Sequence, residues 1–336
     1  MTIPSVTLGP TDVRVLKIAH GLMHMTWKDV HVPDEQAFAS IKAGLDLASP
    51  GQKVLLNSAE FYANAPNRIA NLTLLSRFFT KYPEYADRAL VSVKGGTAPD
   101  SLIPDTSPEN LKRSVDACVA ALAPKKLDLF ECARVDPKVP VEDAIATLAG
   151  FVKEGLFDYI GVSEVSADTL RRAAKVHPIA CVEIEVSPWS YEEETRKVIT
   201  TAKELGVSVV AYSPIGRGFL TGTLTKKNIA NTGDFRSHLP RFQEEAYETN
   251  KKFVDALAKV STRLGITNAK LCIAWVASLG PHVIPLPGSS APVRTLENFS
   301  AAEVKLSDED LAEINAAIIS HDILGGRYPQ GIPLWG

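Results

Sequence analysis

Cysteine, long apolar runs and an excess of one charge are all scarce in this chain of 336 residues. The four cysteines (Cys118, Cys132, Cys181 and Cys272) lie far apart and lack the spacing of metal ligands, so we expect free thiols in a reducing compartment. No apolar run reaches the roughly 18 residues that a membrane-spanning helix requires. With a net charge of −3 and no dense Lys/Arg run, the sequence indicates no basic patch for binding nucleic acid.

Targeting and dinucleotide-binding signals are also absent. The first residues have neither a basic start nor a long apolar stretch, so we expect no signal peptide and a cytoplasmic protein. No glycine-rich dinucleotide fingerprint follows any apolar run, which counts against a Rossmann sheet. Neither a linker nor an internal repeat is visible, and we expect one domain over residues 1–336.

Short β-rich runs instead alternate with amphipathic stretches along the chain. The predicted strands are Val15–Gly21, Val54–Asn57, Ala89–Lys94, Leu127–Cys132, Tyr159–Ser163, Ala180–Val186, Val207–Tyr212 and Val283–Leu286. The predicted helices are Asp34–Ala48, Pro66–Thr80, Pro108–Leu122, Val141–Glu154, Ala167–Val176, Glu192–Leu205 and Glu244–Leu264. Because many of the strands are apolar on both faces, this alternation predicts an α/β fold, a single parallel (β/α)8 TIM barrel.

Two segments depart from a plain barrel. Residues Ser213–Gln243 have weak periodicity, and a loop of this length is usually functional or mobile. An additional predicted helix, Asp308–Ala317, precedes an irregular tail. Since Arg327, Tyr328 and Trp335 lie in this tail, we expect it to be packed rather than free.

Reactive side chains of such a barrel gather where strands end and loops begin. Asn57 and Tyr62 follow one predicted strand, and Lys94 ends the next. A phenol has a pKa near 10, and a neighbouring cation lowers it by roughly 1–3 units. We therefore predict that Lys94 lowers the pKa of Tyr62, which gives a proton to a carbonyl oxygen while a hydride attacks the carbon. The strand ends hold neither a carboxylate cluster nor a histidine pair for a metal.

Five segments, in order, resemble the aldo-keto reductase family. They are Asn57–Tyr62, Lys94, Ile160–Ser163, Ala211–Gly218, and Ile284–Ser289 with Leu296–Asn298. The resemblance extends from about Gly21 to Asn298. It implies reduction of an aldehyde with NADPH and catalytic roles for Tyr62, Lys94 and Asn57, to which we add Arg134 as a candidate.

The same resemblance implies a cofactor site built from many strand ends. Its expected members are Gly21, Met23, Ser163, Glu164, Glu183, Tyr212, Ser213, Pro214, Ile215, Gly216, Arg217, Gly218, Gly288, Ser289, Ser290, Arg294, Glu297 and Asn298. Tyr212 would stack on the nicotinamide, with Glu183 accepting from its carboxamide. Arg294 would hold the ribose phosphate, and because Arg pairs well with phosphate this favours NADPH over NADH.

Three positions depart from the family's pattern. Asn57 stands where the family has Asp, so Lys94 is expected to lose a salt-bridge partner while the amide oxygen still orients it. Ala133 stands where the family has His. Arg134 is a candidate replacement, although strand alternation points it away, and His24 lies at another strand end. Glu183 stands where Gln is expected.

These departures resemble one branch of the family, the fungal pyridoxal reductases. The segments Leu127–Asp136 and Ile323–Tyr328 carry the likeness. It implies reversible reduction of pyridoxal to pyridoxine, a pyridoxine 4-dehydrogenase activity of vitamin metabolism, with Trp27 and Phe61 as walls for a flat aromatic aldehyde. The alternatives are a general aromatic aldehyde reductase, a slow-turnover NADPH-binding regulatory subunit, and a Schiff-base enzyme in which the pKa of Lys94 is lowered.

Overall fold

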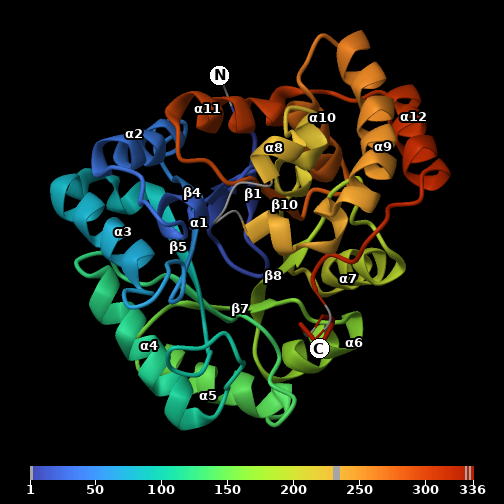
Figure 1. Ribbon diagram of the computed structural model, residues 1–336. Coiled ribbons are helices and arrows are strands. Elements are labelled where there is room, and N and C mark those ends of the chain that lie inside the picture. Colours follow the sequence, from blue (N-terminus) through green and yellow to red (C-terminus); the bar gives the residue numbers. More distant parts are fainter. Residues whose placement is uncertain (1–2, 230–234, 330, 333) are drawn as a thin grey trace.

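Parallel strands form a closed barrel in the computed structural model, which describes residues 3–229, 235–329, 331–332 and 334–336 (Figure 1). The barrel strands are β3 (His20–Gly21), β4 (Gln52–Ala59), β5 (Ala89–Gly95), β6 (Leu129–Cys132), β7 (Tyr159–Ser163), β8 (Ile179–Glu185), β9 (Ser208–Tyr212) and β10 (Val283–Leu286). Each pairs in parallel with the next. A parallel bridge between Gly21 and Gly288 joins the first strand to the last. The predicted TIM barrel is thereby confirmed.

Helices surround this barrel (Figure 1). Those between the strands and after the last strand are α1 (Met23–Thr26), α2 (Asp34–Leu45), α3 (Ala70–Lys81), α4 (Pro108–Leu122), α5 (Val141–Lys153), α6 (Ala167–Val176), α7 (Glu193–Leu205), α10 (Asn268–Ser278) and α11 (Pro292–Ser300), with a 3-10 helix at Pro83–Arg88 and another at Ala301–Glu303. The bounds predicted for α4 and α6 are confirmed. The sequence did not indicate α10, because a run of consecutive buried residues hides the helical period.

The predicted strand Val15–Gly21 is wrong as a single element. Its first part is β2 (Arg14–Leu16), which pairs antiparallel with β1 (Ser5–Thr7), and its last part is β3. The split arises because the chain changes partners: the amide of Ala19 donates to the carbonyl of Pro285 on β10 at 2.9 Å. A backbone amide in the hairpin turn bonds to β9, so the hairpin closes the N-terminal end of the barrel.

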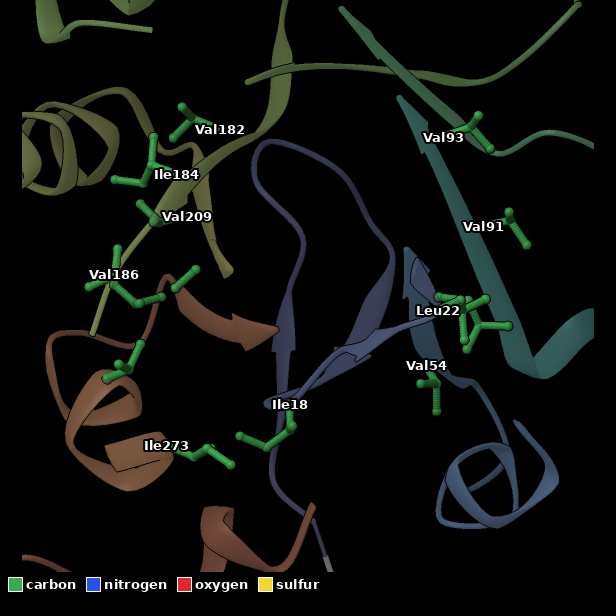
Figure 2. Packing of buried hydrophobic residues seen from close by; sticks show 14 of the residues in the cluster. Ile18, Leu22, Val54, Val91, Val93, Val182, Ile184, Val186, Val209 and Ile273 are labelled. Atoms are coloured by element: carbon green, nitrogen blue, oxygen red, sulfur yellow. The ribbon is translucent and has the colours of Figure 1, made fainter. Parts of the chain in front are cut away.

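Alternation along the strands separates two sets of side chains. One set points outward onto the helices: Figure 2 shows Val91 and Val93 on β5, and Val182 and Ile184 on β8, pointing away from the barrel. The other set points inward. Beside the hairpin, the inward side chains form an apolar layer that comprises Leu8, Val15, Ala19, Leu55, Leu90, Leu129, Cys181, Val210 and Ile284. Polar residues occupy the inward positions closer to the C-terminal strand ends.

The segment after β9 consists of short helical turns, which explains its weak periodicity. They are Gly216–Thr221, α8 (Lys226–Ile229), Phe235–His238 and Pro240–Phe242, followed by α9 (Glu244–Arg263). Residues 230–234 of the predicted loop lie outside the described residues. The additional helix is α12 (Asp308–Ser320), and the packed tail is confirmed, since Arg327 is only 4% exposed.

All four cysteines are free thiols. Among the helices of the described ranges, none combines the length and apolarity needed to cross a membrane.

Candidate active site

A layer of polar side chains fills the barrel above the apolar one. It is formed by Asn57 on β4, Ser92 and Lys94 on β5, Glu131 on β6 and Glu183 on β8, all of which are at most 5% exposed. Their registers place Lys94 opposite Glu131, and Glu183 opposite Ser163. Because charged groups are costly to bury alone, the arrangement of these side chains must balance their charges.

Lys94 is held by an amide and a carboxylate. Its Nζ donates to Oδ1 of Asn57 at 2.6 Å and to Oε1 of Glu183 at 3.0 Å. Nδ2 of Asn57 donates to Oε2 of Glu183 at 2.6 Å, which closes a triangle. The orienting contact expected from Asn57 is present. The salt-bridge partner that position 57 does not supply comes instead from Glu183, which reaches across the barrel from β8.

Tyr62 lies directly beside this ammonium. Nζ of Lys94 is 5.0 Å from the centroid of the Tyr62 ring, and Tyr62 is 7% exposed. Burial raises the pKa of Tyr62 to about 12; Lys94 acts in the opposite direction, and the carboxyl groups of Glu183 and Glu131 reinforce the rise. Lys94 thus lowers the pKa of Tyr62 as predicted, but the net shift is upward. Desolvation outweighs the cation, and the phenol stays protonated at neutral pH.

The pKa of Lys94 also departs from its ordinary value. Burial alone would lower this pKa, but the neighbouring Glu183, Tyr62 and Glu131 raise it instead. A Schiff-base lysine needs a lowered pKa so that its amine is free to attack a carbonyl. The site therefore counts against the Schiff-base alternative.

Glu131 is a member of the layer that the sequence reasoning missed. Its side chain is fully buried, and Oε1 accepts from Oγ of Ser92 at 3.2 Å. Burial raises the pKa of Glu131 well above its usual range, and the nearby Glu183 raises it further. The protonated form of Glu131 is thereby favoured, whereas Glu183 forms the ion pair with Lys94. Its register opposite Lys94 on the next strand is the signal that could have identified it.

A buried hydrogen-bond chain fixes the segment that carries Tyr62. Oγ1 of Thr26 donates to the carbonyl oxygen of Tyr62 at 2.5 Å, and Nδ2 of Asn71 donates to that same Oγ1 at 2.7 Å. Oγ of Ser58 donates to Oδ1 of Asn71 at 2.6 Å. The helix α3 thereby joins α1, the end of β4 and the tyrosine into one unit.

Aromatic side chains pack beside Tyr62. The ring of Trp27 lies 5.6 Å from that of Tyr62 and 6.1 Å from that of Phe61. Ala133 and the partly buried Met23 belong to the same apolar cluster. The structure therefore places the two predicted substrate-wall residues next to the predicted proton donor, and a small side chain stands where the family has a histidine.

Arg134 lies on a different side of the site. Its guanidinium is 5.8 Å from the ring of Tyr328 in the tail. The titratable groups near it are Tyr212, Tyr328 and Glu164. One guanidinium nitrogen donates to the carbonyl of Ala133 at 2.6 Å. The structure therefore brings Arg134 to the tail rather than to the polar layer around Lys94.

The tail and the segment after β9 meet in a buried network of two arginines and two glutamates. Arg327 donates to both carboxylate oxygens of Glu164, at 3.2 and 3.1 Å. Arg217 donates to Glu185 at 2.8 Å and to the carbonyl oxygen of Arg327 at 3.1 Å. The hydroxyl of Tyr212 donates to Glu164 at 2.9 Å. Glu164, expected to contact the cofactor, is thus already the partner of Arg327, and the sequence did not indicate these pairings.

Several features fit a dinucleotide at the remaining expected cofactor residues. Oγ of Ser163 is buried without a hydrogen-bond partner in the described chain, so it is available to a ligand. At Gly216, with a φ of +56°, a Cβ atom would lie 2.6 Å from the Trp189 ring. At Gly21 a Cβ atom would lie 3.3 Å from Gly288. These glycines permit close backbone approaches that other residues would disturb.

The segment between β10 and α11 has the chemistry of an anion site. Ser289 and Ser290 precede the N-terminus of α11, where backbone amides favour a negative charge. Arg294 is exposed in the first turn of this helix. Glu297 accepts from Oγ1 of Thr267 at 2.8 Å, and Asn298 is buried.

No group of three or more His, Cys, Asp or Glu side chains within the described ranges could hold a metal ion.

The chain belongs to the Aldo/keto reductase family, whose sequence pattern matches residues 17–319. Among its relatives, "Probable pyridoxal reductase 2" of Schizosaccharomyces pombe is 36% identical over 321 residues, which cover 94% of this chain and 95% of that protein. Aldo-keto reductase yakc of the same yeast, whose name includes NADP(+), is 36% identical over 229 residues, 68% of this chain and 67% of that protein. The structure of glycerol dehydrogenase AKR11B4 from Gluconobacter oxydans, 21% identical and covering 98% of each chain, has the same fold, with a TM-score of 0.80. The protein is therefore an oxidoreductase of small aldehydes that uses NAD(P)H.

Proposed function

We propose that this protein is a cytoplasmic, NADPH-dependent reductase that converts pyridoxal to pyridoxine, with Tyr62 as the proton donor. The observation that carries the proposal is the buried phenol of Tyr62, which lies beside the Lys94 ammonium and packs against the ring of Trp27. A flat aromatic aldehyde is complementary to the rings of Trp27 and Phe61.

Bound NADPH supplies the hydride for the carbonyl carbon. Tyr62 holds a proton at its Oη and gives it to the carbonyl oxygen as negative charge develops there, so an aldehyde becomes a primary alcohol. The phenolate left on Tyr62 is stabilised by the Lys94 ammonium, and a proton from solvent restores the phenol. Asn57 and Glu183 hold Lys94 in place throughout. Ala133 leaves room for the ring of the aldehyde.

The remaining residues of the proposed cofactor site would each contact a different part of NADPH. Tyr212 would stack on the nicotinamide, and the free hydroxyl of Ser163 would bond to its carboxamide. The turn from Ser213 to Gly218 would lie over the pyrophosphate. Arg294 with Ser289 and Ser290 would hold the 2′-phosphate at the N-terminus of α11.

The choice of pyridoxal rests on the likeness to a relative named as a probable pyridoxal reductase and on the aromatic side chains of Trp27 and Phe61 beside Tyr62. The test follows NADPH absorbance with purified protein against pyridoxal and plain benzaldehydes, and NADP(+) reduction with pyridoxine. We expect the ratio kcat/KM to favour pyridoxal. Equal values for benzaldehydes would contradict pyridoxal specificity and support a general aromatic aldehyde reductase, and no turnover with any aldehyde would contradict the proposed activity.

A further inference from the structure

Glu183 uses both of its carboxylate oxygens inside the barrel. Oε1 accepts from Lys94 at 3.0 Å, while Oε2 accepts from Asn57 at 2.6 Å and from Lys94 at 3.3 Å. Lys94 and Glu183 are 6% and 4% exposed at their side chains. A cofactor carboxamide that bonded to Glu183 would have to compete with these contacts.

We propose that Glu183 is a positioning residue, the counter-ion that holds the Lys94 ammonium beside Tyr62, and that Asn57 fixes this carboxylate rather than replacing it. The amide and the carboxylate have therefore exchanged places relative to the pattern expected at positions 57 and 183. This inference rests on the proposed function, in which Tyr62 is the acid.

The barrel provides the space for this contact. The strands β5 and β8 are separated by β6 and β7, so the pair of Lys94 and Glu183 spans the interior. On β7 the inward position is Gly161, where a Cβ atom would lie 3.1 Å from Oε2 of Glu131 and 3.1 Å from Sγ of Cys181. Any larger residue there would crowd the layer that contains both carboxyl groups.

The exchange of amide and carboxylate between positions 57 and 183 determines the charge balance around Lys94. Lys94 and Glu183 form a buried ion pair, and burial together with Glu183 raises the pKa of the neighbouring Glu131. The other titratable groups that face the pair are Tyr62, from the segment after β4, and Cys181, on β8. An amide at position 183 would leave Lys94 unbalanced, whereas a second carboxylate at position 57 would leave an excess negative charge.

The experiment compares Glu183→Gln, Asn57→Asp and the double variant Asn57→Asp/Glu183→Gln, with the exposed Glu109→Gln as a charge-matched control. We expect each single variant in the barrel to lower kcat by about tenfold or more, and the double variant to recover to within about threefold of the native protein. If Glu183 instead binds the carboxamide, Glu183→Gln keeps its kcat and changes the Kd for NADPH. Retained activity in Glu183→Gln, or a double variant no better than it, would overturn the proposal.

A second readout does not depend on turnover. Tyrosinate absorbance, with the Tyr62→Phe protein as the reference, reports the ionisation of Tyr62 directly. We expect this ionisation at lower pH in Glu183→Gln, at higher pH in Asn57→Asp, and near the native value in the double variant. Unshifted titrations would contradict the counter-ion role. Full turnover in Tyr62→Phe would contradict the proposed function alone.

Stability provides the test if Glu183→Gln does not fold. The double variant is then expected to fold where the single variant fails, because the carboxylate introduced at position 57 balances Lys94. A double variant that also fails to fold would overturn the proposal.

Discussion

Burial strengthens the preference of Tyr62 for its protonated form. The pKa of its phenol is raised to about 12 by desolvation, with Lys94 only moderating the rise. A general acid must carry its proton when the substrate binds, and a raised pKa ensures this across the physiological range. The ammonium has its larger effect after transfer, when a buried phenolate beside Lys94 is far better stabilised than an isolated one.

Removal of the hydroxyl of Tyr62 tests this role. We expect Tyr62→Phe to lower kcat by about two to four orders of magnitude, because only the general acid is lost. The Kd for NADPH, measured by quenching of tryptophan fluorescence, should change little. Turnover at the native rate would refute Tyr62 as the donor.

Arg294 is the residue on which cofactor preference is expected to depend. We expect Arg294→Ala to weaken binding of NADPH at least about tenfold while NADH binding stays nearly constant, because only NADPH carries the 2′-phosphate. Titration of both cofactors measures the ratio, and Arg294→Lys, which keeps the charge, should lie between the two proteins. Equal losses for both cofactors would locate the phosphate site elsewhere.

At the scale of elements, the tail and the segment after β9 are held to the barrel rim by charge. Arg327 and Arg217 meet Glu164 and Glu185, and all four side chains are at most 7% exposed. The hydroxyls of Tyr212 and Tyr328 lie 3.0 Å apart in the same network. The expected nicotinamide residue Tyr212 is therefore oriented from the C-terminal tail, which lies beside the barrel rim.

Loss of one arginine from this network should be costly. Arg327→Ala leaves Glu164 buried and unpaired, so we expect the free energy of unfolding to fall by about 3–5 kcal/mol. The control is Arg171→Ala, whose ion pair with Glu204 is exposed at 43% and 52% of the side chains and should contribute about 0–1 kcal/mol. Urea unfolding measures both. Equal losses would show that the network does not stabilise the native tail.

At the scale of the whole molecule, the local sequence pattern predicted the barrel but not the contacts between residues that are distant in the sequence. The short apolar runs of β4 and β5 indicated strands, and the ends of these strands indicated Tyr62 and Lys94. The pair of Lys94 and Glu183 joins strands that are not neighbours, so only closure of the barrel brings it about. The sign of the Tyr62 pKa shift also depends on burial, which no motif reports. Arg327 meets Glu164 across 163 positions of sequence.

Closure of the barrel also makes its stability sensitive to acid. His20 on β3 is fully buried against α11, its Nε2 donating to the carbonyl of Ser289 at 3.0 Å and its ring lying 6.4 Å from that of Phe299. Burial lowers the pKa of His20 to about 4, against 6.5 in its ordinary state, and the Ser289 contact only partly opposes this. The unfolded chain therefore binds a proton at higher pH than the native protein does, and stability falls as pH drops from about 6.5 to 4.

This linkage should amount to about 3 kcal/mol between pH 7 and pH 4, the free energy that corresponds to the difference between the two pKa values. We expect His20→Gln to lose that part of the pH dependence, while its stability at pH 7 falls by about 1–2 kcal/mol through poorer packing and hydrogen bonding. Urea unfolding of both proteins across this pH range isolates His20, because His282, whose pKa burial also lowers, is present in each. Parallel stability curves for the two proteins would show that the pKa of His20 is the same in the native and unfolded states, contrary to its burial where β3 meets α11.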